Sequence, residues 1–381
     1  MSRWGKVELR KICTVNMGQS PNSSTYNQDG YGIPFYQGNA DFGELHPKPR
    51  YYCTKPAKLA QRGDILISVR APIGDLNIAT STCCIGRGLA ALTAFEDITY
   101  PKYLYYLLRA KNKELNQKGT GSTFKAISKQ TLSKILCPLP PLEIQKHIAK
   151  TLDTAAELLA LRKQQLTELD NLLKSVFYDM FGDPQINEKN WDMGKIKDLT
   201  AKMQYGTSAK ASTKKLKYPI LRMNNITYQG NMDFSDLKYI DLNEKEKTKY
   251  LVHKGELLFN RTNSKELVGK TAVFKEDKPM AFAGYLIKLV PNKRANSEFI
   301  SAYLNSSYGK KLLKKMAKNI IGMANINAQE LSSIKIYIPP ITLQNQFADI
   351  VAKIEDQKDL VKKAIDETQY LFDCLMSEYF N

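Results

Sequence analysis

Several arginine and amide side chains stand in short polar loops that directly follow apolar runs. Arg70 precedes "APIGD", Arg87 lies between two glycines in "IGRGL", and Arg261 lies with Asn263 in "FNRTNSKE". An arginine guanidinium can form paired hydrogen bonds with guanine, and an asparagine or glutamine amide can do so with adenine. Lysine, serine and threonine side chains suit phosphate oxygens. The chemistry that these residue types predict is recognition of nucleic acid.

Two groups of residues combine such side chains with a loop position. The group in the first half of the chain is Gln19, Ser20, Arg70, Arg87, Lys118, Ser122, Thr123 and Lys125. The group in the second half is Ser208, Lys210, Arg222, Asn224, Asn225, Arg261, Asn263, Lys265 and Tyr285. Any single member could instead be a solvated surface side chain or a turn former, so the prediction concerns the loops as wholes.

These loops belong to a sequence that is repeated in tandem with an offset of 199 residues. The stretch "PLPPLEIQ" starting at Pro138 corresponds to "YIPPITLQ" starting at Tyr337, and Phe181 corresponds to Phe380. Upstream, "GDILIS" at Gly63 echoes "GELLFN" at Gly255. The chain therefore consists of two units, each with a globular part followed by a long helix.

Each helical tail contains a series of mostly apolar positions at alternating steps of three and four residues. The series begins at Gln145 in the first tail and at Gln344 in the second. This 3.5-residue period is the pattern of a coiled-coil seam. We predict that the two helices pair along this seam, although each could instead pack on its own globular half. The apolar seam positions are Ile148, Leu152, Leu159, Leu166, Leu169, Leu173 and Val176 in the first helix, and Phe347, Val351, Ile354, Val361, Ile365, Phe372 and Leu375 in the second.

The net charge of +18 is distributed unevenly along the 381 residues. Residues 1–140 carry +10 and residues 183–338 carry +13, whereas the helices 141–182 and 339–381 carry −1 and −4. A basic globular part favours a polyanionic partner. The globular parts are therefore the predicted binding surfaces, and the helices between them are predicted to act as a spacer.

Short apolar runs after glycine predict strands in each globular part, and residues 101–115 and 297–316 predict helices. The expected fold is α+β. Two globular domains (1–140 and 183–338) are each followed by a long helix (141–182 and 339–381), and the helices pair as an antiparallel coiled coil with pseudo-twofold symmetry.

Motifs for independent chemistry were not found in the sequence. There is no phosphate-binding loop of the P-loop type, no Gly-x-Gly-x-x-Gly after a strand and no Cys-x-x-Cys. The six cysteines are expected to be reduced and buried, and with three scattered histidines a metal site is not expected. Without a long apolar run or a signal-peptide core, the protein is expected to be soluble and cytoplasmic.

The chain resembles the specificity subunit of type I DNA restriction–modification enzymes over its whole length. The resemblance rests on "GSTFKAISKQTLSKILCPLPPLEIQ" and "IPPITLQNQ", each followed by a long helix, and more weakly on "GQSP" (18–21) and "YGTS" (205–208). One departure is "IIGMAN" in the second half, where the first half has "GTGSTF". The role of this loop in the second half therefore stays open.

The resemblance implies a subunit that is not catalytic by itself and that works in an assembly. Each globular domain would be a target-recognition domain that reads one half of a split sequence in double-stranded DNA. The helix pair would set the gap and dock two methyltransferase subunits. S-adenosylmethionine would be bound by those subunits, and ATP and Mg²⁺ by restriction subunits that complete the phage-defence complex.

Two alternatives remain open at this point. The chain could be the specificity subunit of a methylation-only or other phage-defence system. From a different class, it could be a coiled-coil structural adaptor whose basic domains bind RNA or a membrane surface. The sorting of positive charge into the globular parts favours the DNA-recognition function.

Overall fold

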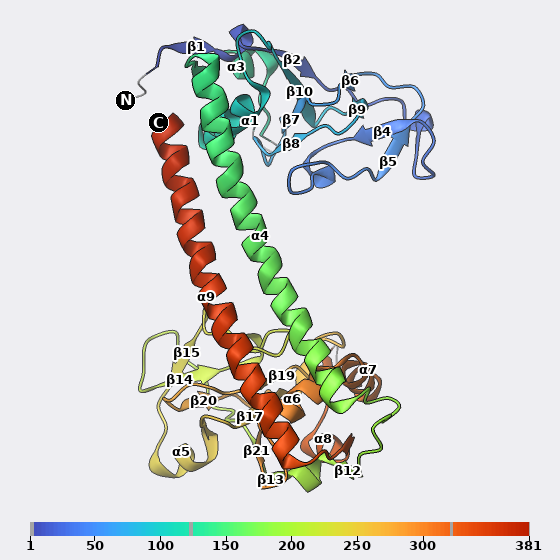
Figure 1. Ribbon diagram of the computed structural model, residues 1–381, viewed down its shortest axis with the longest axis vertical. Helices are drawn as coiled ribbons and strands as arrows, with labels where there is room; N and C mark the ends of the chain where they lie inside the picture. Colours follow the sequence, from blue (N-terminus) through green and yellow to red (C-terminus); the bar gives the residue numbers. More distant parts are fainter. Residues whose placement is uncertain (1–3, 122–124, 321–322, 381) are drawn as a thin grey trace. The chain divides into compact units, whose positions relative to one another are not determined.

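The computed structural model describes residues 4–121, 125–320 and 323–380 (Figure 1). The chain forms two compact units. Unit 1 consists of Met1–Lys163 with Lys363–Asn381, and unit 2 consists of Gln164–Lys362. Each unit thus contains one globular domain and a part of both long helices. Among the described residues, no helix is long and apolar enough to cross a membrane.

The domain of unit 1 is built on two small sheets. An antiparallel sheet has the order β2-β10-β7-β8, and a second sheet has the order β3-β5-β4-β9-β6. The strands are β1 Lys6–Glu8, β2 Cys13–Met17, β3 Tyr26–Asn27, β4 Ile33–Tyr36, β5 Tyr51–Cys53, β6 Leu59–Ala60, β7 Ile65–Ser68, β8 Leu76–Ile78, β9 Cys83–Ile85, β10 Leu89–Ala94 and β11 Leu136–Pro138. The helices are α1 Pro101–Ala110, α2 Asn112–Gln117 and α3 Lys129–Ser133, with 3-10 turns η1 Leu9–Lys11, η2 Ser23–Thr25 and η3 Asn39–Asp41.

The domain of unit 2 repeats this topology. Its first sheet has the order β13-β21-β17-β19 and its second β15-β14-β20-β16. The strands are β12 Met193–Lys195, β13 Thr200–Tyr205, β14 Tyr218–Leu221, β15 Lys238–Ile240, β16 Leu251–Val252, β17 Leu257–Asn260, β18 Thr262–Asn263, β19 Thr271–Val273, β20 Met280–Phe282, β21 Leu286–Pro291, β22 Lys318–Ile320, β23 Met323–Asn325 and β24 Lys335–Tyr337. The helices are α5 Glu244–Tyr250, α6 Ser297–Asn305, α7 Ser307–Met316 and α8 Ala328–Ser332, with 3-10 turns η4 Ile196–Leu199 and η5 Met223–Asn225.

The predicted α+β class and tandem repeat are confirmed by the matching strand orders. The second sheet of each unit even contains the same parallel pair, β4 with β9 and β14 with β20. Apolar residues of the first sheet, such as Ile65 and Leu92 in unit 1 and Leu257 and Ile287 in unit 2, are almost fully buried. They pack with residues of α1 or α6 in a large buried cluster in each unit. This burial explains why both halves keep the same apolar strand pattern.

The single helices predicted for 101–115 and 297–316 are each divided into two. Lys111 separates α1 from α2, and Ser306 separates α6 from α7. Ser306 has an extended backbone (φ −60°, ψ 161°), and its side chain accepts a hydrogen bond from the Gly309 amide. Serine caps a helix start in this way. The apolar period of the sequence continues across this cap, so it did not reveal the break.

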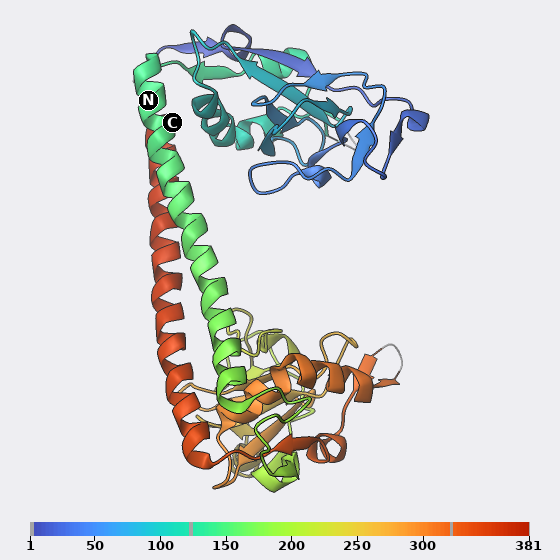
Figure 2. The same ribbon diagram turned by 45° about the vertical axis from the view of Figure 1, so that its right-hand side comes forward.

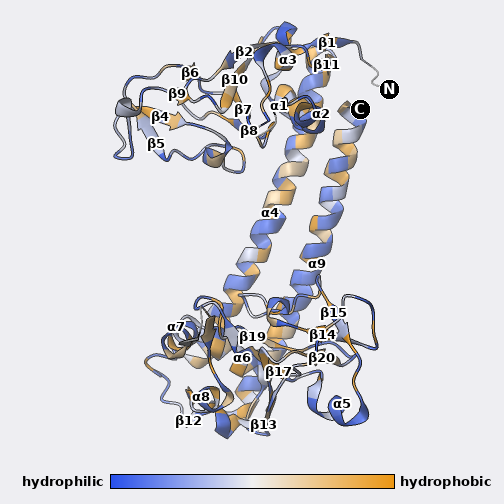
Figure 3. Ribbon diagram, turned by 180° about the vertical axis from the view of Figure 1, so that it is seen from behind, coloured by the Kyte–Doolittle hydropathy of each residue, from blue (hydrophilic) through white to orange (hydrophobic). Residues whose placement is uncertain are grey.

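The two long helices are α4 Leu142–Phe181 and α9 Ile341–Phe380. Hydrophobic positions recur along both between hydrophilic ones (Figure 3). In unit 1 the N-terminal part of α4 runs beside the C-terminal part of α9, and in unit 2 the C-terminal part of α4 runs beside the N-terminal part of α9 (Figures 1 and 2). The predicted antiparallel pairing is therefore confirmed. The first helix stops at Gly182, whose left-handed backbone (φ 77°) suits glycine.

Candidate nucleic-acid interface

Two loops of each domain approach each other at a glycine that has no room for a side chain. A Cβ atom on Gly18 would lie 2.2 Å from the Gly86 carbonyl oxygen, and one on Gly206 would lie 2.2 Å from that of Ala283. In unit 1 the Gly18 amide donates to Leu89 O at 2.8 Å. In unit 2 the Gly206 amide donates to Leu286 O at 3.2 Å. The "GQSP" and "YGTS" openings are thereby fixed beside the loop that precedes β10 or β21.

The same loop also holds the end of the central strand, where the predicted arginines lie. The Val69 amide donates to Gly88 O at 2.9 Å, just before Arg70. In unit 2 the Arg261 amide donates to Tyr285 O at 3.0 Å. A third segment thus joins the two loops in both units, and the join uses backbone hydrogen bonds that do not depend on side-chain identity.

A fourth segment folds back over each arginine. In unit 1 the Ala71 amide donates to Lys125 O at 3.0 Å, and Thr120 and Ala126 exchange two hydrogen bonds of 2.9 Å. In unit 2, β22 and β23 form a hairpin, β23 pairs with β18, and the Ile326 amide donates to Arg261 O at 2.9 Å. The described residues after 321–322 therefore contact the end of the central strand, as Lys125 and Ala126 do in unit 1, and those before it pair with them, as Thr120 does. We call the described parts of these four segments together the four-loop cluster of each unit: 18–20, 69–71, 86–88, 119–121 and 125–127 in unit 1, and 206–208, 260–263, 283–285, 317–320 and 323–326 in unit 2.

In unit 1 the four-loop cluster gathers most of the predicted residues. Gln19, Arg70, Arg87 and Lys125 are exposed, and the half-buried Ser20 Oγ accepts a hydrogen bond from the Arg87 amide at 3.4 Å. The cluster therefore presents three cations and one amide to solvent. Lys118 lies just beyond it at the end of α2, where its ammonium is 3.5 Å from Glu114. The predicted residues Ser122 and Thr123 lie outside the described part of the chain.

In unit 2 the central cation is already oriented. The Arg261 guanidinium stacks on the Tyr205 ring at 4.9 Å, and its Nη2 donates to Asn325 Oδ1 at 3.3 Å. Tyr205 is itself held, because its hydroxyl accepts a hydrogen bond from the Ala328 amide at 2.8 Å. Stacking of a guanidinium on an aromatic face is favourable, and the Arg261 Nη1 also donates to Gly284 O at 3.5 Å. The arrangement presents a guanidinium in a fixed direction.

Sequence reasoning missed Tyr205, Asn325 and Asn260. Asn260 is completely buried, and neither atom of its amide has a hydrogen-bond partner among the described residues. At the corresponding end of β7, Ser68 is satisfied by Pro72 O at 2.7 Å and the Asp75 amide at 2.9 Å. The one available signal was Tyr205, an aromatic residue directly before the "GTS" opening, where the first half has Met17.

The remaining predicted residues of unit 2 fall into two sets. Ser208, Lys210, Asn224, Lys265 and Tyr285 are exposed, and Asn263 is half-buried in β18. Arg222 and Asn225 are used inside the domain instead: Arg222 forms an ion pair of 2.7 Å with Asp236, and the buried Asn225 amide donates to Asp233 O at 2.8 Å and Asp236 O at 3.1 Å. These bonds make Arg222 and Asn225 supports of the loop around η5, because the Arg222 Nη2 and the Asn225 amide are already engaged there.

A buried glutamine anchors each long helix to its own domain. The Gln145 Oε1 accepts a hydrogen bond from the Tyr100 amide at 2.9 Å, and its Nε2 donates to Ile98 O and Pro140 O at 3.0 and 2.8 Å. In its repeat counterpart Gln344, Oε1 accepts a hydrogen bond from the Asn296 amide at 2.9 Å, and Nε2 donates to Arg294 O and Pro339 O at 3.1 and 2.8 Å. We expected both glutamines at the start of the helix seam. They face the domain instead, because only there are all their hydrogen-bonding groups satisfied.

The apolar residues predicted for the seam are buried or half-buried along both helices. On α9, Phe347, Val351, Ile354, Val361 and Phe372 are buried, whereas Ile365 and Leu375 are half-buried. On α4, Ile148 and Leu152 are buried, whereas Leu159, Leu166, Leu169, Leu173 and Val176 are half-buried. The seam also holds polar contacts. Arg162 donates to Ala364 O and Thr368 Oγ1 in unit 1, and Lys358 is ion-paired with Asp170 in unit 2.

Four leucines on the long helices point away from the seam. Leu161 and Leu172 on α4 are 62% and 48% exposed, and Leu360 and Leu371 on α9 are 60% and 51% exposed. Adding the repeat offset of 199 to the first pair gives the second pair. A single exposed leucine needs no explanation, but the same exposed pair on both helices is a repeated feature that the seam does not require.

Five of the six cysteines are buried as expected, and Cys374 is not. Cys13, Cys53, Cys83, Cys84 and Cys137 are free and buried, whereas Cys374 is exposed on α9. Burial raises the pKa of Cys13, Cys83 and Cys137 to about 12. Such thiols are unreactive core residues. Within the described ranges, no group of three or more His, Cys, Asp or Glu residues could hold a metal ion.

Comparison with known proteins found a family model that matches both halves of the chain, and relatives that match parts of it. The family model "Type I restriction modification DNA specificity domain" matches residues 1–171 and 188–369. The MjaX specificity subunit of a type I restriction enzyme from Methanocaldococcus jannaschii is 43% identical over 45% of this chain and 41% of that protein. The EcoKI specificity subunit of Escherichia coli is 23% identical over 67% of this chain and 58% of that protein. The matched regions thus span less than two thirds of these two relatives.

Solved structures share the fold at low identity. The S subunit of a type I restriction–modification system from M. genitalium has a TM-score of 0.63 at 17% identity, covering 100% of this chain and 96% of that one. A chain from a structure that describes complex assembly of the type I R-M system has a TM-score of 0.62 at 16% identity, covering 99% and 97%. At this identity the likeness shows the fold alone.

Proposed function

Because the chain belongs to the family of type I restriction–modification DNA specificity proteins, we propose that it is the DNA-recognition subunit of such a complex. Unit 1 reads one half of a bipartite target in double-stranded DNA, and unit 2 reads the other. The observation that carries the proposal is the four-loop cluster. It is built twice on one topology by equivalent backbone hydrogen bonds, but its exposed side chains differ between the units.

The differing side chains would give each unit its own base preference. Arg70 and Arg87 stand beside Gln19 in unit 1, whereas Arg261 stands beside Asn263 and Tyr285 in unit 2. Arginine favours guanine, and an amide favours adenine, because each matches the donors and acceptors of that base in the major groove. Lys125 and Lys210 would contact phosphates and contribute affinity without sequence preference.

The helix pair would set the gap between the half-sites and dock the other subunits. Two copies of one partner need two equivalent surfaces, and the exposed leucines would supply one in each unit: Leu161 and Leu371 in unit 1, and their repeat counterparts Leu360 and Leu172 in unit 2. The partners are two methyltransferase subunits, which carry S-adenosylmethionine. Restriction subunits, which carry ATP and Mg²⁺, complete the complex, and the chain itself contributes recognition rather than catalysis.

The test is adenine-methylation mapping of DNA from cells that produce the chain with its methyltransferase partner. We expect one split motif with two unlike halves. The Arg70→Ala variant should relax or abolish one half only, and the Arg261→Ala variant should affect the other half only. A continuous motif, or loss of the same positions in both variants, would contradict the two-reader arrangement. Methylation that does not depend on the chain would favour the adaptor alternative.

A further inference from the structure

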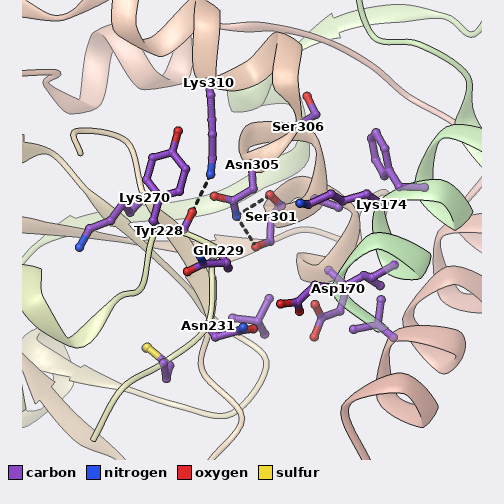
Figure 4. Close-up of a pocket in the computed structure, with 18 of the residues that line it drawn as sticks. Asp170, Lys174, Tyr228, Gln229, Asn231, Lys270, Ser301, Asn305, Ser306 and Lys310 are labelled. Carbon is purple, nitrogen blue, oxygen red and sulfur yellow. Dashed lines mark hydrogen bonds between the residues drawn. The ribbon is translucent and has the colours of Figure 1, made fainter. Parts of the chain in front are cut away.

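Unit 2 contains a cavity of about 960 Å³ between its part of the helix pair and its domain. Its apolar lining includes Leu173 and Phe177 of α4, Val351 of α9 and Val268 of the domain. Nine lysines and six carboxylates also line it. Lys174 enters from α4 and Lys310 from α7, and both point into the same space (Figure 4). The question is why so many lysines gather at this cavity.

Most of the carboxylates are already paired with other lysines. Lys358 contacts Asp170 at 2.8 Å and Glu355 at 2.9 Å. Lys275 contacts Glu298 at 3.0 Å, and Lys362 contacts Asp359 at 2.9 Å. These pairs neutralise one another and leave a different set of lysines without a carboxylate.

Six lining lysines remain, of which Lys265 and Lys270 belong to the segment around β18 and β19. The other four are Lys174 of α4 and Lys310, Lys311 and Lys314 of α7, which we call the α7 lysine group. No ion pair within 4.0 Å joins any of them to a carboxylate in the part of the chain that the structure describes. Lys310 is half-buried, donates to Tyr228 O at 2.6 Å and lies 3.4 Å from the centre of the Tyr228 ring. Burial and the charge of Lys174 lower the pKa of Lys310 to about 8. The described part of unit 2 therefore holds these like charges together without a carboxylate in direct contact, although Glu266 acts on Lys314 at longer range.

The corresponding helix of unit 1 is organised differently. On α2 and at its ends, Lys111 and Lys118 both contact Glu114, at 3.1 and 3.5 Å. The sequence of α7, "SYGKKLLKKM", contains four lysines and no carboxylate. Because the fold of unit 1 forms without such a group, the α7 lysine group is not a requirement of the shared topology.

The group continues from the four-loop cluster of unit 2. The hairpin β22–β23 follows α7 directly and pairs with β18 beside Arg261. Lys314 and Lys265 both act electrostatically on Glu266, which lies three residues after Asn263. Lys265, two residues after Asn263, also lines the cavity, so the segment that follows β18 connects the four-loop cluster of unit 2 to it.

We propose that the α7 lysine group binds a phosphate group of the DNA backbone next to the half-site that unit 2 reads. The proposal rests on the proposed function and adds a contact outside the four-loop cluster. A phosphate supplies the counter-ion that the group lacks, and lysine contacts to phosphate are tolerant of sequence. Unit 1, whose equivalent lysines are paired with Glu114, would lack this contact, so unit 2 would hold the backbone more strongly.

The experiment measures the salt dependence of binding to a random-sequence duplex by the full chain in complex with its methyltransferase partner. The test variant is Lys174→Gln/Lys311→Gln/Lys314→Gln, because these three side chains are exposed and their loss should not affect folding. The matched control is Lys245→Gln/Lys249→Gln/Lys278→Gln, which removes the same charge from exposed positions of α5 and the turn before β20. A Lys→Arg triple at the test positions preserves the charge.

Each lost phosphate contact reduces the slope of log K against log salt concentration by about 0.9. We expect the test variant to lose about one unit of slope, because one phosphate contact is lost, and the control and the Lys→Arg triple to lose none. If the test and control variants lost the same amount of slope, the loss would come from the lower net charge alone, and the proposal would be overturned. An unchanged slope with weaker methyltransferase assembly would assign the group to a protein partner, and would also overturn it.

A second arm distinguishes the source of the phosphate. If millimolar inorganic phosphate raises the melting temperature of the wild type but not of the test variant, while the DNA slopes are equal, the site takes free phosphate and the backbone contact is refuted. Failure of the proposed function looks different, because then the wild-type complex itself would not bind DNA or direct methylation.

Discussion

Lys358 of α9 and Asp170 of α4 form an ion pair of 2.8 Å across the helix seam, and the Lys358 side chain is only 5% exposed. Glu355 adds a second contact at 2.9 Å. Burial by itself lowers the pKa of Lys358, but the hydrogen bonds to Asp170 and Glu355 outweigh it, so that the pKa is raised overall. In the repeat, the position of Lys358 is occupied by Leu159. The seam thus places a charged pair where its counterpart uses an apolar residue.

The first prediction concerns this pair. Lys358→Leu should lower the free energy of unfolding of unit 2 by about 1–3 kcal/mol, because Asp170 and Glu355 lose their partner in a partly buried place. Lys358→Leu/Asp170→Leu should recover most of that loss, since both seam positions are then apolar. Chemical denaturation of the wild type, Lys358→Leu, Asp170→Leu and the double variant measures the coupling energy between the two side chains. Additive effects in the double variant would show that the pair is not coupled.

The second prediction concerns the helix anchors. Gln344→Leu leaves the Asn296 amide and two carbonyl oxygens without their partner, and each unsatisfied buried group costs about 1–3 kcal/mol. We expect a clear loss of stability in unit 2 and, for Gln145→Leu, an equivalent loss in unit 1. Thermal unfolding and hydrogen exchange resolve the two units. Gln346→Leu, an exposed position on α9, is the control and should be nearly neutral.

The third prediction separates base reading from its support. Arg261→Ala should cost about 1–3 kcal/mol at one base position and relax specificity there. Tyr205→Leu keeps the guanidinium but removes the surface on which it stacks, so it should weaken discrimination at the same position by a smaller amount. Lys210→Gln should weaken binding to all sequences and reduce the salt slope by about one. Binding to single-base variants of the mapped site provides the measurement, and a uniform effect of Arg261→Ala would exclude base reading.

The fourth prediction follows from the lowered pKa of Lys310. Its folded pKa of about 8 lies below the ordinary value of 10.5, so the folded protein binds fewer protons than the unfolded chain between these pH values. The free energy of unfolding should therefore rise with pH in this window, and the contribution is lost as the pH falls through 8. Other groups titrate in this window too, so the informative quantity is the free energy of unfolding of the wild type minus that of Lys310→Met. This difference should grow from pH 8 to 10. A constant difference would refute the assignment.

The fifth prediction tests the helices as the ruler of the target. Asp153 of α4 and Phe372 of α9 both contact Tyr106, so the adjoining stretches of the two helices lie together in unit 1. Matched four-residue insertions, between Thr154 and Leu158 and between Thr368 and Phe372, add about 6 Å to both helices. Methylation mapping should find the gap longer by one to two base pairs and the half-sites unchanged. An active variant with the original gap would refute the helix pair as the ruler.

The sequence alone determined the features that depend on local order. The offset of 199 established the repeat, and the alternating steps of three and four established the long helices, because both patterns are written along contiguous residues. The apolar runs after Gly63 and Gly255 placed β7 and β17 in the same way. Even the unlike residues "MAN" (323–325) did not disturb the topology, since β23 pairs through its backbone.

The tertiary structure decided which polar residues face outward together. Arg222 and Arg261 are both polar loop arginines in the sequence, yet Arg222 is occupied by Asp236, and Arg261 is held by Tyr205 and Asn325 from 56 and 64 positions away. Likewise, Gln145 and Gln344 fit the seam period but are satisfied only by their own domains. Partners so distant along the chain are chosen by the packing of the sheets, and that packing depends on the summed burial of many residues rather than on any local pattern.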